Sequence, residues 1–166
     1  MLPDQGLGDT RELHLAWLRY YRSTVERKLT GLSEEELRTS RLPSGWSPLE
    51  LLRHLVFMER RWIRWGFTAE QVDDPWGDAD ADDQWRLAPG DDLDGLLGRL
   101  QAGGERTEEI VAAAELGASA AVGGRFGAGA EVPTLNWILF HVLQEYARHV
   151  GQLDVARELA DGRTGE

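Results

Sequence analysis

The residues best suited to chemistry in this chain are two histidines and a glutamate. Glu145 and His149 stand four residues apart in a stretch with helical character, so a helix would stack them on one face, about 6 Å apart along its axis. His54 lies in a second helical stretch. If the two helices pack together, the three side chains form a ligand set for one divalent metal ion, with positions left open for water or substrate.

Spacing alone leaves other interpretations of these residues open. A core histidine bonded to a carboxylate or a backbone carbonyl is commoner than a metal ligand, and a glutamate–histidine pair four residues apart also occurs as a surface contact. His14 lies on the apolar stripe of an earlier helix, where packing is the commoner role and an extra ligand the rarer one. Arg53 and Arg148, next to two of the candidates, would either meet an anionic substrate or be solvated.

Helical phase separates the candidates on the last helix. At about 100° per residue, His149 falls inside the apolar stripe, Glu145 at its edge, and His141 roughly 90° from its centre. A carboxylate at that edge is costly unless it is paired or bound to a metal. His141 and His149 are about 12 Å apart along the axis and cannot share one ion. Phase therefore favours His149 as the partner of Glu145.

Composition sets the class of protein. A chain of 166 residues with 42% hydrophobic residues predicts a single domain, residues 1–166. The net charge of -11 argues against binding to nucleic acid or to anionic membranes. The chain has no cysteine, so a metal site would use His, Asp and Glu, and no protein thiol can act as nucleophile. We expect a cytoplasmic protein, because the first residues show no targeting pattern and no run approaches a membrane span.

Four long helical patterns, with no convincing strand, predict an all-α four-helix bundle. The expected helices cover about 9–29, 47–65, 91–116 and 133–160, with a short helical piece at 33–36. Ser47, Pro48 and Glu50 give the second helix a strong start signal, and Gly66 is expected to end it. Gly103 and Gly104 weaken the third helix by about 1 kcal/mol each. The long connection between the second and third helices would allow them to be parallel neighbours, joined by a crossover.

That connection, from about residue 67 to residue 90, is acidic. Its aspartates are at 73, 74, 78, 80, 82 and 83, with Trp76 and Trp85 among them. Asp78, Asp80 and Asp82 have the spacing of the first three ligands of a calcium-binding loop. We reject a calcium loop, because Asp83 would be at the sixth position, which needs a glycine, and Pro89 at the twelfth, which needs a bidentate glutamate. We expect a solvated loop whose tryptophans fold against the helices. The seven tryptophans of the chain are interpreted as core and loop anchors rather than a stacking platform.

Two parts of the sequence resemble the DinB-like superfamily, particularly its bacterial branch of unknown function. The segments 42–55 and 59–62 are similar to its second-helix signature, and 145–151, with Asp154 and 161–165, to its fourth-helix signature. The resemblance spans nearly the whole chain. It implies a four-helix bundle with one divalent metal, and it places His54, Glu145 and His149 as the ligands. This set is similar to the zinc site of mycothiol-dependent maleylpyruvate isomerase, a member of the wider superfamily.

Two positions depart from that branch. Asn136 stands where arginine is frequent, and Gln152 stands where histidine is frequent. Neither is an inferred ligand, so the departures leave the metal set intact and instead alter the groups around it or the contacts to substrate.

The resemblance and the donor set together imply a divalent-metal-dependent enzyme that acts on a small molecule. Zinc suits two imidazoles and a carboxylate, and nickel, manganese and iron are alternatives. Because the chain has no cysteine, a thiol would be an external one of the mycothiol or bacillithiol type. A thiol-dependent transferase or isomerase is the first hypothesis. The alternatives are a non-catalytic metal or small-molecule binding module and a metal-dependent hydrolase. A homodimer is expected from exposed tryptophan-rich faces.

Overall fold

The computed structural model describes residues 2–164. Its helices are α1 (Thr10–Leu29), α2 (Glu34–Arg38), α3 (Pro48–Arg60), the π-helical segment η1 (Arg61–Phe67), α4 (Leu93–Ala113) and α5 (Leu135–Asp161). Residues 1, 165 and 166 lie outside the described residues, and with them Gly165 of the fourth-helix signature and both ends of the predicted domain.

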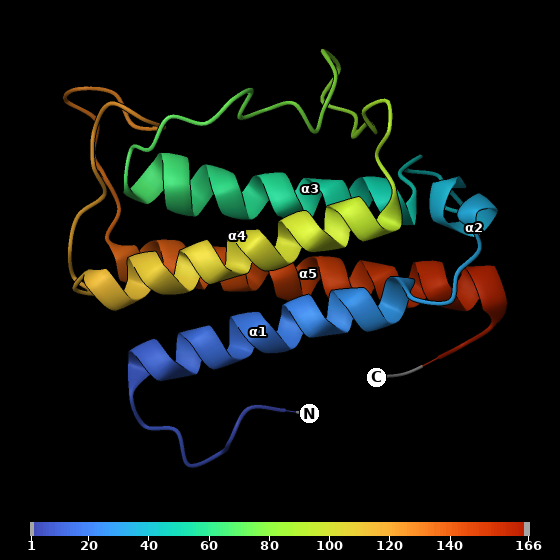
Figure 1. Cartoon of the computed structure of the whole chain (residues 1–166), viewed down its shortest axis with the longest axis horizontal. Coiled ribbons are helices and arrows are strands. Elements are labelled where there is room, and N and C mark those ends of the chain that lie inside the picture. Colours follow the sequence, from blue (N-terminus) through green and yellow to red (C-terminus); the bar gives the residue numbers. More distant parts are fainter. Residues whose placement is uncertain (1, 165–166) are drawn as a thin grey trace.

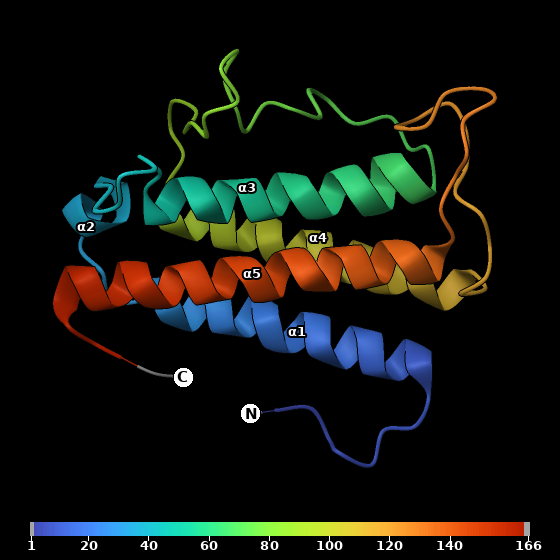
Figure 2. The ribbon, with the colours of Figure 1, turned by 180° about the vertical axis from the view of Figure 1, so that it is seen from behind.

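The four long helices form a bundle, as predicted (Figure 1). α1 and α5 run in one direction, and α3 and α4 run in the other (Figures 1 and 2). α3 and α4 contact each other directly, so they are parallel neighbours and the predicted crossover is confirmed. The connection between them returns along the outside of the bundle, over α3 (Figure 1). None of the described helices combines the length and apolarity needed to cross a bilayer.

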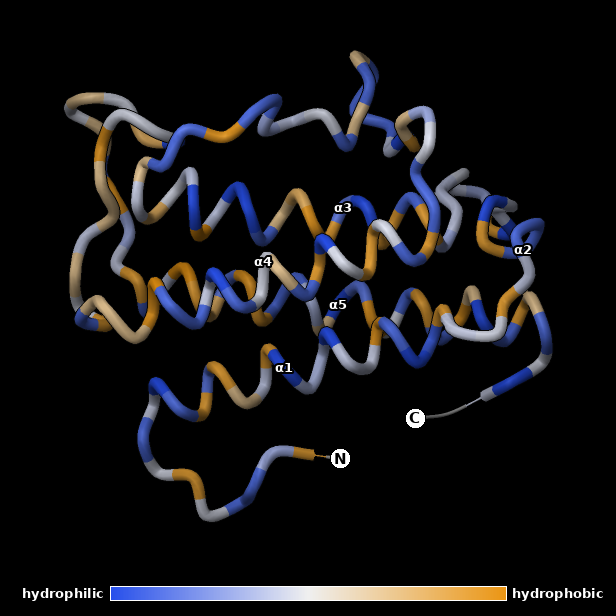
Figure 3. The backbone as a smooth tube through the Cα atoms, in the orientation of Figure 1, coloured by the Kyte–Doolittle hydropathy of each residue, from blue (hydrophilic) through white to orange (hydrophobic). Residues whose placement is uncertain are grey.

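Side-chain caps define where the helices begin. Asp9, Ser33, Ser47, Asp92 and Thr134 each accept a hydrogen bond from a backbone N–H of the first turn of their helix. These bonds satisfy donors that the helix itself cannot pair. The capping box predicted at Ser47 is present, with Pro48 in the first turn. Inward faces of the helices supply the leucine-rich core, so hydrophobic and hydrophilic residues alternate along each long helix (Figure 3).

Two predicted helix boundaries were wrong. The second helix does not end at Gly66 but widens at Arg61 into η1 and ends at Phe67. A Cβ at Gly66 would lie 2.9 Å from the carbonyl oxygen of Arg61, so glycine is needed inside this turn rather than as its stop signal. α4 is shorter than expected and ends at Ala113. There the Arg11 side chain of α1 binds the carbonyl oxygens of Val111 and Ala114, which satisfies the last turn.

A buried polar network joins all four long helices. Glu59 of α3 binds Arg22 of α1, Thr107 of α4 and Tyr146 of α5, at 2.5 Å from each. Burial opposes ionisation of Glu59, but the charge and hydrogen bonds of Arg22 outweigh it and lower the pKa of Glu59. Gly104 makes room for this pair, because a Cβ there would lie 2.7 Å from Cζ of Arg22. The glycine expected only to weaken the helix thus allows the network to form.

Candidate metal centre

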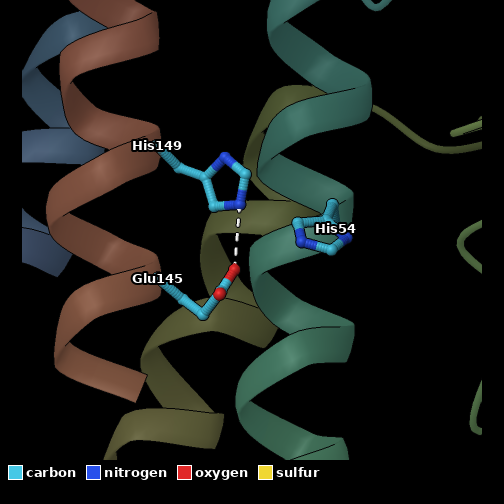
Figure 4. A group of neighbouring side chains, drawn as sticks. All are labelled: His54, Glu145 and His149. Carbon is cyan, nitrogen blue, oxygen red and sulfur yellow. Dashed lines mark hydrogen bonds and ion pairs between the residues drawn. The ribbon is translucent and has the colours of Figure 1, made fainter. Parts of the chain in front are cut away.

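The structure brings His54, Glu145 and His149 together. His54 projects from α3, and Glu145 and His149 project from α5 toward it (Figure 4). One potential ligand atom from each residue lies within 4.8 Å of the other two. The three side chains meet because α3 and α5 are packed neighbours, which was the condition for a shared site. Their role as metal ligands stays a prediction.

His149 is buried and held from both ring nitrogens. Its Nδ1 lies 2.7 Å from Oε1 of Gln152, and its Nε2 lies 3.2 Å from Oε2 of Glu145. An amide oxygen only accepts, so Nδ1 carries the hydrogen. Burial lowers the pKa of His149, which favours the neutral ring. The Nε2 lone pair then faces a carboxylate, and two acceptors at this distance need a cation between them, either a proton or a metal ion.

His54 is oriented by a carboxylate of the crossover loop. Its Nδ1 lies 2.9 Å from Oδ2 of Asp78, which only accepts when ionised, so Nε2 is free as a ligand. Asp78 is 2% exposed and binds the Arg61 guanidinium through both carboxylate oxygens. Burial opposes its ionisation, but hydrogen bonds from His54 and Arg61 outweigh that and lower the pKa of Asp78. Metal-binding histidines are commonly oriented by a carboxylate in this way.

The crossover loop is solvated over most of its length, as expected, since five of its six aspartates are exposed or half-buried, but Asp78 is an exception. Asp78 and Asp91 are both buried, because arginines of α3 and η1 reach outward and bind them. Arg53 pairs with Asp91 at 2.7 Å and donates to the carbonyl oxygens of Gly77 and Arg86. Arg53 is thus occupied in holding the loop, and the suggestion that it meets a substrate was wrong. Arg148, by contrast, is exposed.

Aromatic rings wall the site on both sides. Trp85 of the loop stacks on His54, with ring centroids 4.2 Å apart and planes at 18°, and its edge meets His149 at 5.3 Å. Next to Glu145, the ring of Trp62 lies 4.2 Å from the ring of His141, and the ring of Trp137 is stacked parallel to that of His141 at 5.4 Å. Trp85 does anchor the loop, as expected. Trp137, 52% exposed, instead presents a flat surface near the trio.

The remaining histidines lie outside the trio, as helical phase indicated for His141. His14 is buried, and its Nε2 lies 3.0 Å from Oδ1 of Asn136, so it has the packing role expected as the commoner one. His141 Nε2 lies 3.9 Å from Oε1 of Glu145, a longer separation than that between Glu145 and His149. Burial lowers the pKa of His141, and the nearby charge of Arg125 lowers it further.

Two positioning residues were missed from the sequence. Asp78 is one of six aspartates in its loop, and nothing local distinguishes it from the others. Gln152 follows His149 by three residues, a spacing that puts both on one helical face. That spacing was available as a signal: Gln152 was expected to alter the groups around the metal set or the contacts to substrate, but its bond to His149 was not predicted.

Comparisons with known proteins agree with the four-helix bundle. YfiT from Bacillus subtilis, described as a probable metal-dependent hydrolase with an unusual four-helix bundle topology, has a solved structure that superposes with a TM-score of 0.58. The two are 14% identical, and the match covers 92% of this chain and 91% of that one, which shows a common fold. No curated protein matches the sequence significantly. The model of the mycothiol S-transferase family matches residues 13–162. This chain is therefore a member of the mycothiol S-transferase family, within the DinB-like superfamily.

Proposed function

We propose that the protein is a divalent-metal-dependent enzyme that transfers a low-molecular-weight thiol to a small electrophile, or isomerises a substrate through such a thiol. The observation that carries the proposal is the trio of His54, Glu145 and His149, in which the Nδ1 atom of each imidazole is held by a residue outside the trio and one potential ligand atom of each residue lies near the others. Membership of the mycothiol S-transferase family supports the reaction class.

The donor set fits a metal such as zinc. Two neutral imidazoles and one carboxylate are ligands that zinc accepts, and three protein ligands leave a position open. A divalent ion held there would act as a Lewis acid and lower the pKa of a thiol or water brought to it. Asp78 and Gln152 would fix the ring orientations, and Trp85 would keep bulk water from one face of His54.

The thiol must come from outside the chain, because the chain has no cysteine. We propose a thiol of the mycothiol or bacillithiol type. Such a thiol stays reduced in the cytoplasm, which is where we place the protein. Trp62, Trp137 and His141 would offer flat apolar surfaces to the electrophile near Glu145.

Metal analysis tests the ligand assignment. Protein loaded with zinc and dialysed should hold about one ion per chain, and His149→Ala, Glu145→Ala and His54→Ala should each lose it. His14→Ala is the matched control, since this buried histidine lies outside the trio, and it should keep the ion. Full occupancy in the three trio variants would overturn the assignment.

Activity is tested separately. The zinc-loaded protein is incubated with mycothiol, bacillithiol or glutathione and a panel of electrophiles, and adducts or isomers are followed by mass spectrometry. We expect product that depends on both the metal and Glu145. Metal binding without product across the panel would favour the binding module.

A metal-dependent hydrolase is the second candidate, favoured by the shared fold with YfiT, which carries that description. The same trio would then lower the pKa of water rather than of a thiol. Release of product from ester and amide substrates in the absence of any thiol would support the hydrolase over the transferase.

We also propose a homodimer. α5 carries four exposed large apolar side chains, at Trp137, Phe140, Val155 and Leu159, and α1 adds Leu13. Exposed apolar surface of this kind marks interfaces when it is contiguous. Light scattering after size-exclusion chromatography should give twice the chain mass, and a monomer at micromolar concentration would contradict the proposal.

A further inference from the structure

The loop between α4 and α5 is fixed against the π-helical segment by its backbone. The amide of Arg125 donates to the carbonyl oxygen of Trp65 at 3.2 Å, and the amide of Ala121 donates to that of Phe67 at 2.8 Å. Gly124 allows this approach, because a Cβ there would lie 2.1 Å from the Trp65 oxygen. The loop is therefore built to place the Arg125 side chain at one point on η1. Such π-helical segments occur frequently at functional sites.

Arg125 lies against two tryptophans but has no acidic partner. Its Cζ is 4.1 Å from the centre of the Trp62 ring and 5.1 Å from that of Trp76. Within residues 2–164 its side chain forms no ion pair, and its Nη1 is buried without a hydrogen-bond partner. Neighbouring Arg61 is paired with Asp78, whereas no carboxylate of the described residues is paired with Arg125. The Arg125 residue as a whole is half-buried, but a donor atom buried without a hydrogen bond is costly and needs an explanation.

The position of Arg125 relative to the trio gives that explanation. Trp62, which Arg125 covers, is in contact with His141, and His141 lies 3.9 Å from Glu145. Trp62 follows His54 by eight residues along α3 and η1, so the backbone positions of the two residues are about 12 Å apart along the bundle. The rings of Trp62, His141 and Trp137 contact one another and would form the surface on which a ligand lies between the trio and Arg125. This span matches a small molecule that has one end at the trio and the other at Arg125.

We propose that Arg125, held between Trp62 and Trp76, binds a carboxylate of the small molecule whose reactive end reaches His54, Glu145 and His149. A guanidinium binds a carboxylate through two parallel hydrogen bonds, and the flat rings beside it suit a planar or aromatic acid. The whole chain has a net charge of -11 and repels anions, so a local cation is needed to hold one. This substrate class rests on the proposed function, but the binding step does not require the metal.

The test uses para-fluorobenzoate as the probe and follows its binding by fluorine NMR, with para-fluorobenzamide as the uncharged comparison. Measurements are made on the full chain, both treated with chelator and loaded with zinc. We expect the benzoate to bind in both states and the benzamide to bind in neither. Arg125→Gln should weaken binding on the order of tenfold to a hundredfold, the cost of one hydrogen-bonded charge, and Arg125→Lys by less. Arg148→Gln, on the exposed face of α5, should bind as the native protein does.

Several results would overturn the proposal. Equal binding of benzoate and benzamide would show that the rings alone hold the probe. Binding that Arg125→Gln leaves unchanged, or that occurs only with zinc, would place the carboxylate elsewhere. The absence of binding by the native chain would show that Arg125 only stacks on the tryptophans to fix the loop. Circular dichroism of Arg125→Gln checks that the variant is folded. Because the chelated protein is measured too, a failure of the metal proposal would leave this result interpretable.

Discussion

Replacing Asp78 with asparagine tests whether the crossover loop supports the trio. The native carboxylate accepts from His54 at Oδ2 and from Arg61 at both oxygens. Asparagine has one accepting oxygen and one donating amide group. If its oxygen faces His54, its NH2 group meets the donors of Arg61. If its oxygen faces Arg61, the NH2 group meets the Nδ1–H of His54. The variant can therefore satisfy only one of the two partners.

Two magnitudes follow from this geometry. Loss of a carboxylate that orients a metal-binding histidine typically costs tenfold to a hundredfold in metal affinity, or about 1.4 to 2.8 kcal/mol. The metal-free protein should also lose about 3 kcal/mol of stability, the low end for a buried charge whose partner is removed. The low end applies because Arg61 keeps its hydrogen bond to the Pro75 carbonyl oxygen and its contact with Trp76.

The assay separates the two effects. Zinc affinity is measured by competition with a chelating dye under conditions where the protein is folded, and stability is measured by urea unfolding in chelator. Asp82→Asn is the matched control, because its side chain is exposed and lies in the same loop; both values should stay native. A folded Asp78→Asn protein whose zinc dissociation constant is within a factor of about two of the native value would refute the reasoning. Removing a residue that orients a metal ligand weakens metal binding by more than that.

Three further perturbations probe the bundle. Gly104→Ala should destabilise the protein by about 1 to 3 kcal/mol, because its Cβ would press on Arg22. Gly103→Ala should stabilise the protein by about 0.5 to 1 kcal/mol, because no atom lies within 4 Å of the added Cβ. Ser47→Ala should cost about 0.5 to 2 kcal/mol by removing the cap of α3. His14 has its pKa lowered below 6.5 by burial, so metal-free protein should lose stability as the pH falls through 6.5, and His14→Gln should make that loss shallower.

The signs of these effects can be checked by urea unfolding. At His14 the unfolded chain binds a proton more readily than the folded one. The contribution of neutral His14 to the free energy of unfolding is therefore present above pH 6.5 and is lost on acidification. Equal slopes of the free energy of unfolding against pH, for native and His14→Gln protein between pH 7 and 5, would contradict this. If Gly104→Ala and Gly103→Ala change the free energy of unfolding in the same direction, Arg22 can move aside freely. Ser44→Ala, at an exposed serine before the same helix, should leave stability unchanged if the Ser47 effect is a capping effect.

Local patterns explain why most of the fold was predictable. Apolar residues repeated with the period of a helix and caps such as Ser47 act within one or two turns of chain, as does Gly162, which ends α5 in the left-handed conformation. Such signals can be recognised without knowing the partners of each helix. The widening of α3 into η1 was not predictable in this way. It depends on Gly66 and on a distant loop whose Ala121 and Arg125 amides pair with the carbonyl oxygens of this segment.

Parts of the candidate site were predictable from local sequence, and other parts were not. The spacing and phase of Glu145 and His149 place them on one face of one helix, which sequence alone determines. The absence of cysteine likewise decides in advance that any thiol is an external one. The metal role of the trio stays a prediction that these local rules and the family resemblance favour.

Only the tertiary structure decided which of many similar charges matter. Asp78 became the partner of His54, Arg53 was committed to Asp91, and Arg125 was left without a carboxylate. Each of these pairings joins residues that are distant in sequence or depends on which loop folds over which helix. Residue type and spacing contain no information about them, because a charge acts on whatever the packed chain brings within a few ångströms of it.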